Sequence, residues 1–164
     1  MRSVEIELAL ANHLGYRRNL IVPNVFWGFD LKYEADLLVV TKNHYCWEIE
    51  IKVTISDLKA EKNKSYRAHC SNRIKRLYFA VPDAMATEAM GFIPERAGLF
   101  SVSEGGYVRA LKPPKLNKSA RALTQEEINK LYELSAMRIW SLKRALFQRS
   151  LSRITKSSEA KGEK

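Results

Sequence analysis

Acidic and basic side chains alternate with apolar ones along residues 45–53. Glu48, Glu50 and Lys52 are separated by Ile49 and Ile51 in this segment. A period of two predicts a β-strand with one charged face and one apolar face. Two explanations fit a charged face: the strand lies at the edge of a sheet in water, or its side chains line a polar cleft.

A further carboxylate lies in the apolar segment that precedes this strand. If Thr41 pairs with Tyr45 across a short turn, the register sets Asp36 directly opposite Glu50, with Cβ atoms about 5 Å apart. If Val40 pairs with Tyr45 instead, Asp36 turns to the other face. Because a buried carboxylate is costly unless it is paired, hydrogen-bonded or bound to a metal, the first register predicts a polar site.

Two carboxylates at that distance call for a positive charge between them. They repel by about 3 kcal/mol at an effective dielectric near 20. Lys52 lies roughly 7 Å along the same face by strand rise, and Mg²⁺ or Mn²⁺ would neutralise more of the charge. Such a cation polarises a phosphoryl oxygen and lowers the pKa of bound water, while the lysine orients that water or stabilises the transition state. The set suits phosphodiester hydrolysis.

The first predicted helix offers one more acid. Residues 3–14 carry apolar residues at helical spacing, and Glu7 lies beside that stripe, which makes it a better candidate than Glu5. The alternative is that both acids only favour the positive end of the helix dipole.

The remaining pattern predicts an α/β fold with a mixed β-sheet flanked by helices. The expected order is helix, three strands, helix, strand, hairpin and helix, with Ser3, Thr54 or Ser56, and Thr124 as helix N-caps and Gly15 as a C-cap. We expect one domain over residues 1–149 and a basic, disordered tail over 150–164. The predicted segments are helices at 3–14, 56–70 and after Thr124, strands at 19–26, 34–40, 45–53 and 76–81, and a hairpin around Glu104–Gly106.

Charge and composition indicate the class of partner. The 164-residue chain has a net charge of +10, which favours nucleic acid or an anionic membrane surface as partner. Its two cysteines show no zinc-binding spacing. Neither a signal peptide nor a membrane-spanning run is evident, so we expect a cytoplasmic protein that does not bind membranes.

Two basic segments are candidate contacts to DNA. The first follows the charged strand, where its cations would lie near the cleft and give salt-dependent affinity. The last helix is also basic; it would fit DNA, an acidic partner or a membrane, or simply pack on the core with a wet outer face. The candidate nucleic-acid-binding residues of the first segment are Lys59, Lys62, Lys64, Arg67 and Arg73.

These residues resemble the PD-(D/E)XK nuclease superfamily. Asp36 followed after a short hairpin by Glu50-Ile51-Lys52, behind a helix with Glu7, is similar to its motif. "EIEIKVTISDLKAEKNK", "RLYFAVP" and "AGLF" more narrowly resemble the MmcB-like branch and related phage or prophage proteins, over residues 5–103.

The resemblance implies a restriction-endonuclease-like core and a role in DNA repair or processing. It implies Mg²⁺ or Mn²⁺ held by Asp36 and Glu50, with Lys52 and Glu7 completing the catalytic set. Asp57 and Glu61 would contact the residues that hold the metal, without binding the metal themselves. One departure is that Ala35, not proline, precedes Asp36.

The sequence therefore predicts a metal-dependent deoxyribonuclease. Because members of this superfamily have lost activity while keeping the fold, a non-catalytic DNA-binding or repair-accessory protein is the alternative. A third reading is a phage-borne protein that binds a host protein through its basic last helix.

Overall fold

The computed structural model describes residues 1–26, 31, 33–61 and 71–162. Six strands form one sheet in the order β1-β2-β3-β4-β5-β6, so neighbours in sequence are neighbours in space. The elements are α1 (Ser3–His13), β1 (Leu20–Val25), β2 (Ala35–Val40), β3 (Cys46–Ile51), α2 (Ile55–Glu61), β4 (Ile74–Pro82), a 3-10 turn η2 (Asp83–Met85), α3 (Ala86–Ala89), β5 (Gly98–Val102), β6 (Val108–Lys112) and α4 (Gln125–Gly162).

The sheet is mixed, as the sequence predicted. Hairpins make the β1–β2, β2–β3 and β5–β6 pairs antiparallel. Crossovers through α2 and through η2 and α3 make the β3–β4 and β4–β5 pairs parallel. This arrangement gives β3 a hydrogen-bonded neighbour on each side.

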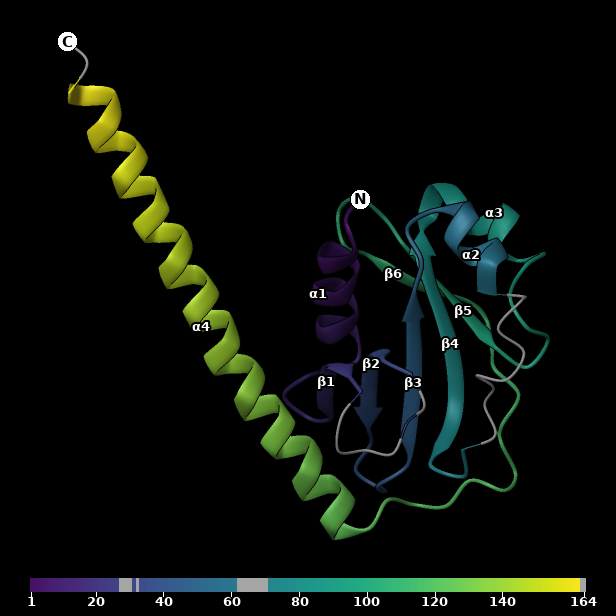
Figure 1. The fold of residues 1–164 in the computed structure, drawn as a ribbon. Coiled ribbons are helices and arrows are strands. Elements are labelled where there is room, and N and C mark those ends of the chain that lie inside the picture. The colour runs from purple at the N-terminus through teal and green to yellow at the C-terminus, as the bar shows by residue number, and fades with distance from the viewer. Residues whose placement is uncertain (27–30, 32, 62–70, 163–164) are drawn as a thin grey trace.

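Helices cover both faces of the sheet (Figure 1). Ile6 and Leu10 of α1 pack on one face, against Ile49 and Ile51 among others. On the other face, the first turns of α4 cover β1 and β2, and α2 and α3 cover β4 and β5. Residues 48 and 50 alternate with 49 and 51, so Glu48 and Glu50 project from the face that α2 and α4 share.

Helix boundaries follow local capping. Ser3 is not the cap of α1, because the helix begins at Ser3 itself and Glu5 accepts a hydrogen bond of 2.6 Å from the backbone N–H of Arg2. Gly15 follows the helix at φ +72°, which glycine adopts without strain. The Oγ1 atoms of Thr54 and Thr124 each accept a backbone N–H three residues on, as predicted for α2 and α4.

The last helix is longer than expected. α4 continues to Gly162 and so runs through the segment that the sequence predicted to be disordered. Among the described residues, no helix is both long and apolar enough to cross a membrane.

Candidate functional site

Glu50 and Lys52 form a buried ion pair on the central strand. Lys52 Nζ lies 3.0 Å from Glu50 Oε2, and the two side chains are only 11% and 5% exposed, respectively. Since β3 is paired with both β2 and β4, the explanation that placed its charged face at a solvated edge is wrong. A buried pair of this kind is costly to desolvate, and it marks a position where charge is kept in the interior.

Asp36 reaches the same strand through the backbone. The register is the one required above, because Val40 pairs with Cys46 and Leu37 with Ile49, and one more step sets Asp36 across from Glu50. The regular ladder ends before that step. Asp36 Oδ2 instead accepts a hydrogen bond of 2.7 Å from the N–H of Ile51. The Asp36 carboxylate therefore lies against the peptide that joins Glu50 to Ile51.

Strand β1 is irregular at the same level. Pro23 pairs with Leu37 and Val25 with Ala35, while Asn24 between them has φ +51°. This local break lets the Asp36 side chain occupy a position that a backbone carbonyl fills in an unbroken ladder.

Glu7 approaches this site from α1. Burial raises the pKa of the half-buried Glu7 carboxyl, and the negative charge of Asp36 raises it further. Like charges shift a pKa in this way when they are close, so Glu7 and Asp36 share one electrostatic environment. The structure thus places Glu7 near Asp36, and Asp36 against the backbone of β3, whereas the Glu50 side chain projects from the sheet face opposite α1.

A second buried carboxylate was not singled out from the sequence. Glu48 is 1% exposed and accepts a hydrogen bond of 2.9 Å from the hydroxyl of Tyr33. Burial lowers the pKa of the Arg96 guanidinium, and the negative charge of Glu48 opposes that shift. The alternating pattern that drew attention to Glu50 also contains Glu48. The residues that act on Glu48, however, lie far away in the chain: Tyr33 is 15 positions before it and Arg96 is 48 positions after it.

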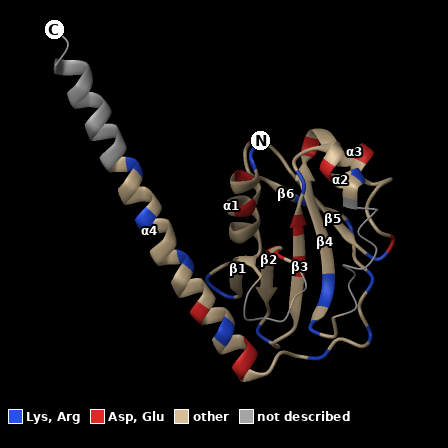
Figure 2. Ribbon diagram, viewed as in Figure 1, with Lys and Arg blue, Asp and Glu red and all other residues tan. Residues whose placement is uncertain are grey.

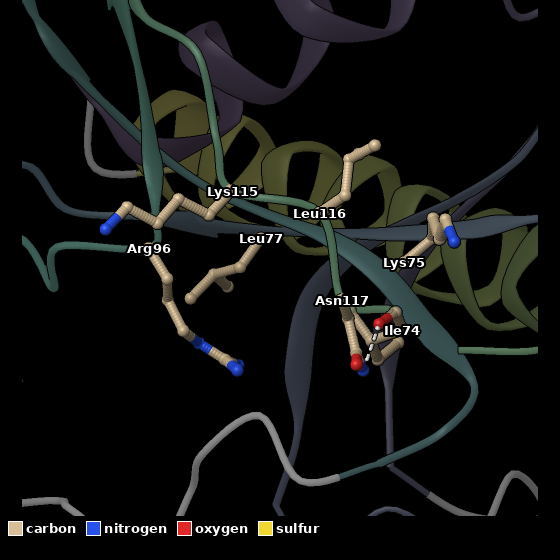
Figure 3. A pocket seen from close by; sticks show the side chains of 7 residues that line it. All are labelled: Ile74, Lys75, Leu77, Arg96, Lys115, Leu116 and Asn117. Atoms are coloured by element: carbon tan, nitrogen blue, oxygen red, sulfur yellow. Dashed lines mark hydrogen bonds between the residues drawn. The ribbon is translucent and has the colours of Figure 1, made fainter. Parts of the chain in front are cut away.

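Arg96 also lines a small pocket of about 60 Å³ beside β4 (Figure 3). The guanidinium of Arg96 extends toward the space between Leu77 and Asn117, and Asn117 is fixed by a hydrogen bond of 3.0 Å to the carbonyl of Ile74. Three cationic residues line the pocket. Its lining residues are Ile74, Lys75, Leu77, Arg96, Lys115, Leu116 and Asn117.

The predicted nucleic-acid-binding residues that the structure describes differ in their exposure. Lys59 is exposed on α2, with Nζ 3.4 Å from Glu88 and 4.7 Å from the Phe92 ring centre. Arg73 is instead held at 2.5 Å by Glu127 in a largely buried pair. Lys62, Lys64 and Arg67 lie outside the described residues.

The two acids expected to support the site lie on α2. Asp57 is exposed in the first turn, where its N–H bonds to Thr54, and this is an ordinary helix-start position. Glu61 is the last residue of α2. Figure 2 shows acidic residues toward the C-terminal end of β3 and basic residues at the start of β4 and along α4.

The residues near the end of β3 fit a small hard cation. Among the described residues, no three His, Cys, Asp or Glu side chains gather as a ready metal-binding group. Mg²⁺ does not need one, because it keeps several waters and binds through one or two carboxylates. Asp36 and Glu50 carry oxygen donors of that kind, and Asp36 lies against the peptide that joins Glu50 to Ile51. Burial is the main cause of the raised pKa of Glu7, and the negative charge of Asp36 adds to it.

Comparison with known proteins identifies the family. The model of the MmcB-like family of DNA repair proteins matches residues 31–146, which is most of the chain and includes Asp36, Glu50 and Lys52. The chain belongs to this family. The resemblance to the MmcB-like branch is thereby confirmed, and with it the place in the PD-(D/E)XK superfamily.

A solved structure shares the fold. The SPO1766 protein of unknown function from Silicibacter pomeroyi is 18% identical and aligns with a TM-score of 0.61, over 92% of this chain and 94% of its own. The α/β core of restriction-endonuclease type, with its mixed sheet between helices, is confirmed. None of the curated proteins matches the chain.

Proposed function

We propose that this MmcB-like protein is a metal-dependent deoxyribonuclease that hydrolyses phosphodiester bonds during DNA repair. The observation that carries the proposal is the placement of Asp36 against the Glu50–Ile51 peptide, with Lys52 3.0 Å from Glu50. Carboxylates and an amine around one strand end are the groups that metal-assisted phosphodiester hydrolysis uses.

Each side chain has a role in this proposal. Asp36 and Glu50 would hold Mg²⁺ or Mn²⁺, which when bound supplies a polarised phosphoryl oxygen and an acidified water. Lys52 orients the attacking water or stabilises negative charge on the phosphate. Glu7, with its raised pKa, accepts or holds a proton beside Asp36.

The DNA backbone would meet cationic residues outside this carboxylate group. Lys75, Arg96 and Lys115 line one pocket, and the chain as a whole carries a net charge of +10. Phosphate contacts of this type give an affinity that falls steeply with salt.

A second candidate function is a non-catalytic DNA-binding repair accessory with the same fold. It is favoured by two observations: Lys52 already neutralises Glu50 in the structure, and the described residues form no group of three metal ligands.

A cleavage assay distinguishes the nuclease from the non-catalytic accessory. The purified full chain is incubated with labelled single-stranded and double-stranded DNA. We expect cleavage with Mg²⁺ or Mn²⁺ and none with EDTA. Asp36→Asn should abolish cleavage while its amide oxygen still accepts the Ile51 hydrogen bond. The matched control is Asp83→Asn, which changes an acid at an exposed ion pair with Arg109 and should leave cleavage unchanged.

Circular dichroism of each variant shows whether the fold is retained. Salt-sensitive DNA binding without cleavage under either metal overturns the nuclease proposal in favour of the accessory. The absence of any salt-sensitive DNA binding overturns both.

A further inference from the structure

The second half of the described part of α4 leaves the domain. Leu131 and Leu134 are buried against the sheet, and Arg138 Nη2 donates to the carbonyl of Asn24 on β1. Every residue from 136 to 150 is exposed. In Figure 1 this part of the helix projects away from the sheet.

Large apolar side chains follow one side of this projecting segment. They are more than half exposed, from 54% at Leu146 to 67% at Trp140. At 100° per residue they fall within an arc of about 160°, which we call the distal stripe. The distal stripe consists of Ile139, Trp140, Leu142, Leu146 and Phe147.

The charges lie mainly outside the distal stripe. Arg138, Arg144 and Arg149 all fall beyond its edges by the same helical count. Lys143 lies within the arc, with its Nζ 5.2 Å from the centre of the Trp140 ring. A polyanion such as DNA would meet the arginines and leave the distal stripe in water, so a polyanion does not explain the apolar side.

Packing against a second copy of this chain explains the exposed apolar residues of the distal stripe. Packing two distal stripes together removes five large side chains per copy from water, on the order of 100 Å² each. This gives about 500 Å² per copy and about 1,000 Å² in total, which reaches the lower limit for a specific interface. The arginines stay at the outer edges in water, and one lysine within an apolar seam is a feature that fixes register in helix pairs.

We infer that α4 is a homodimerisation arm, in which the distal stripes of two copies pack against each other. The like charges at the edges oppose this association, and salt screens them. Dimerisation should therefore tighten as salt rises, whereas DNA binding weakens under the same change. These opposite salt dependences separate the two events in one protein.

The test is light scattering with sedimentation on full-length protein at about 0.1 M and about 1 M NaCl, where the Debye length is about 10 Å and 3 Å. We expect a dimer that is tighter at high salt. Leu146→Glu should raise the dissociation constant at least about 30-fold. Gln148→Glu adds the same charge on the opposite side of the helix, within the same turn, and should leave most of the association intact.

Both positions are exposed, so neither substitution threatens the fold. A monomer at both salt concentrations overturns the inference, as does an equal effect of the two variants. Vesicles of phosphatidylserine and phosphatidylcholine provide the competing surface. If the protein stays monomeric but binds them, and Leu146→Glu removes that binding, the occupant of the distal stripe is a membrane and the dimer inference fails.

Discussion

Tyr33 donates a hydrogen bond of 2.9 Å to the carboxylate of Glu48. Tyr33 lies three residues before Asp36, and Glu48 lies two residues before Glu50. The contact therefore ties the segment that leads into Asp36 to the strand that carries Glu50. Because Glu48 is 1% exposed, its hydrogen bonds are made in the interior, where each donor matters most.

Replacing Tyr33 with phenylalanine should destabilise the protein. The ring is kept, but a buried carboxylate loses one donor, which costs about 1–3 kcal/mol. Chemical denaturation of Tyr33→Phe against wild type measures the change. Tyr107→Phe is the matched control, because Tyr107 is 70% exposed and should show almost no change. Equal stability of the two variants would show that the Tyr33–Glu48 contact contributes nothing.

Removing only the cation of the buried pair should be more harmful than removing the pair. Lys52→Met leaves the Glu50 charge in the interior and should cost about 3–5 kcal/mol. The double variant Glu50→Gln/Lys52→Met removes both charges and should recover much of that stability. Urea denaturation of the two single variants and the double variant gives the coupling free energy. Additive losses would mean that the two side chains do not stabilise each other.

The strands and the mixed character of the sheet could be predicted from local patterns. The period of two in residues 45–53 and the short turn after Val40 left two registers of β2 on β3 open, and the Val40–Cys46 and Leu37–Ile49 pairs show that the one with Asp36 across from Glu50 is correct. The pattern could not show whether the strand lies at the edge or in the centre of the sheet. An edge strand and a central strand with a polar face have the same alternation, and only the parallel pairing with β4 distinguishes them.

In the candidate site, only contacts between residues that are close along the chain were predictable. Glu50 and Lys52 belong to one strand, and Asp36 is one hairpin away. Tyr33 bonds to Glu48, and the charge of Glu48 acts on Arg96, only because of the tertiary fold, so no sequence spacing could indicate either residue. For Arg73 the local sequence was misleading. Its place after a run of cations predicted a contact to DNA, but its side chain pairs with Glu127, which lies 54 residues later on α4.

Neutralising Glu7 should stabilise the protein near neutral pH. Its pKa is raised from 4.5 by burial and by Asp36, so the charged form is disfavoured in the folded state. Glu7→Gln should therefore raise the melting temperature at pH 7, and the gain should disappear below pH 4.5, where the carboxyl is protonated in both states. Thermal melts at both pH values measure this.

Magnesium provides a further check on the same variant. If cation binding near Asp36 relieves the charge on Glu7, Mg²⁺ should raise the melting temperature of wild type more than that of Glu7→Gln. If Glu7→Gln raised the melting temperature equally at pH 7 and at low pH, the charge of Glu7 would not be the cause of the gain.

Glu127 should make stability fall in acid. Its carboxylate accepts hydrogen bonds from Arg121, Arg73 and the N–H of Thr124, where it completes a capping box at the start of α4. The Arg121 side chain, followed by Arg73, holds the Glu127 pKa well below its ordinary 4.5, despite burial. The folded state therefore favours the charged form, and this stability is present above pH 4.5 and is lost as pH falls below it.

Glu127→Gln should accordingly destabilise the protein most at pH 7, with a deficit that shrinks steadily below pH 4.5 as the wild-type carboxylate loses its advantage. Denaturant titrations of both proteins across this range measure the deficit. Glu133→Gln is the control on the same helix, because Glu133 is 66% exposed and pairs only weakly with Lys130 at 3.5 Å. A deficit that is constant with pH would assign the effect of Glu127 to shape or hydrogen bonding rather than to its charge.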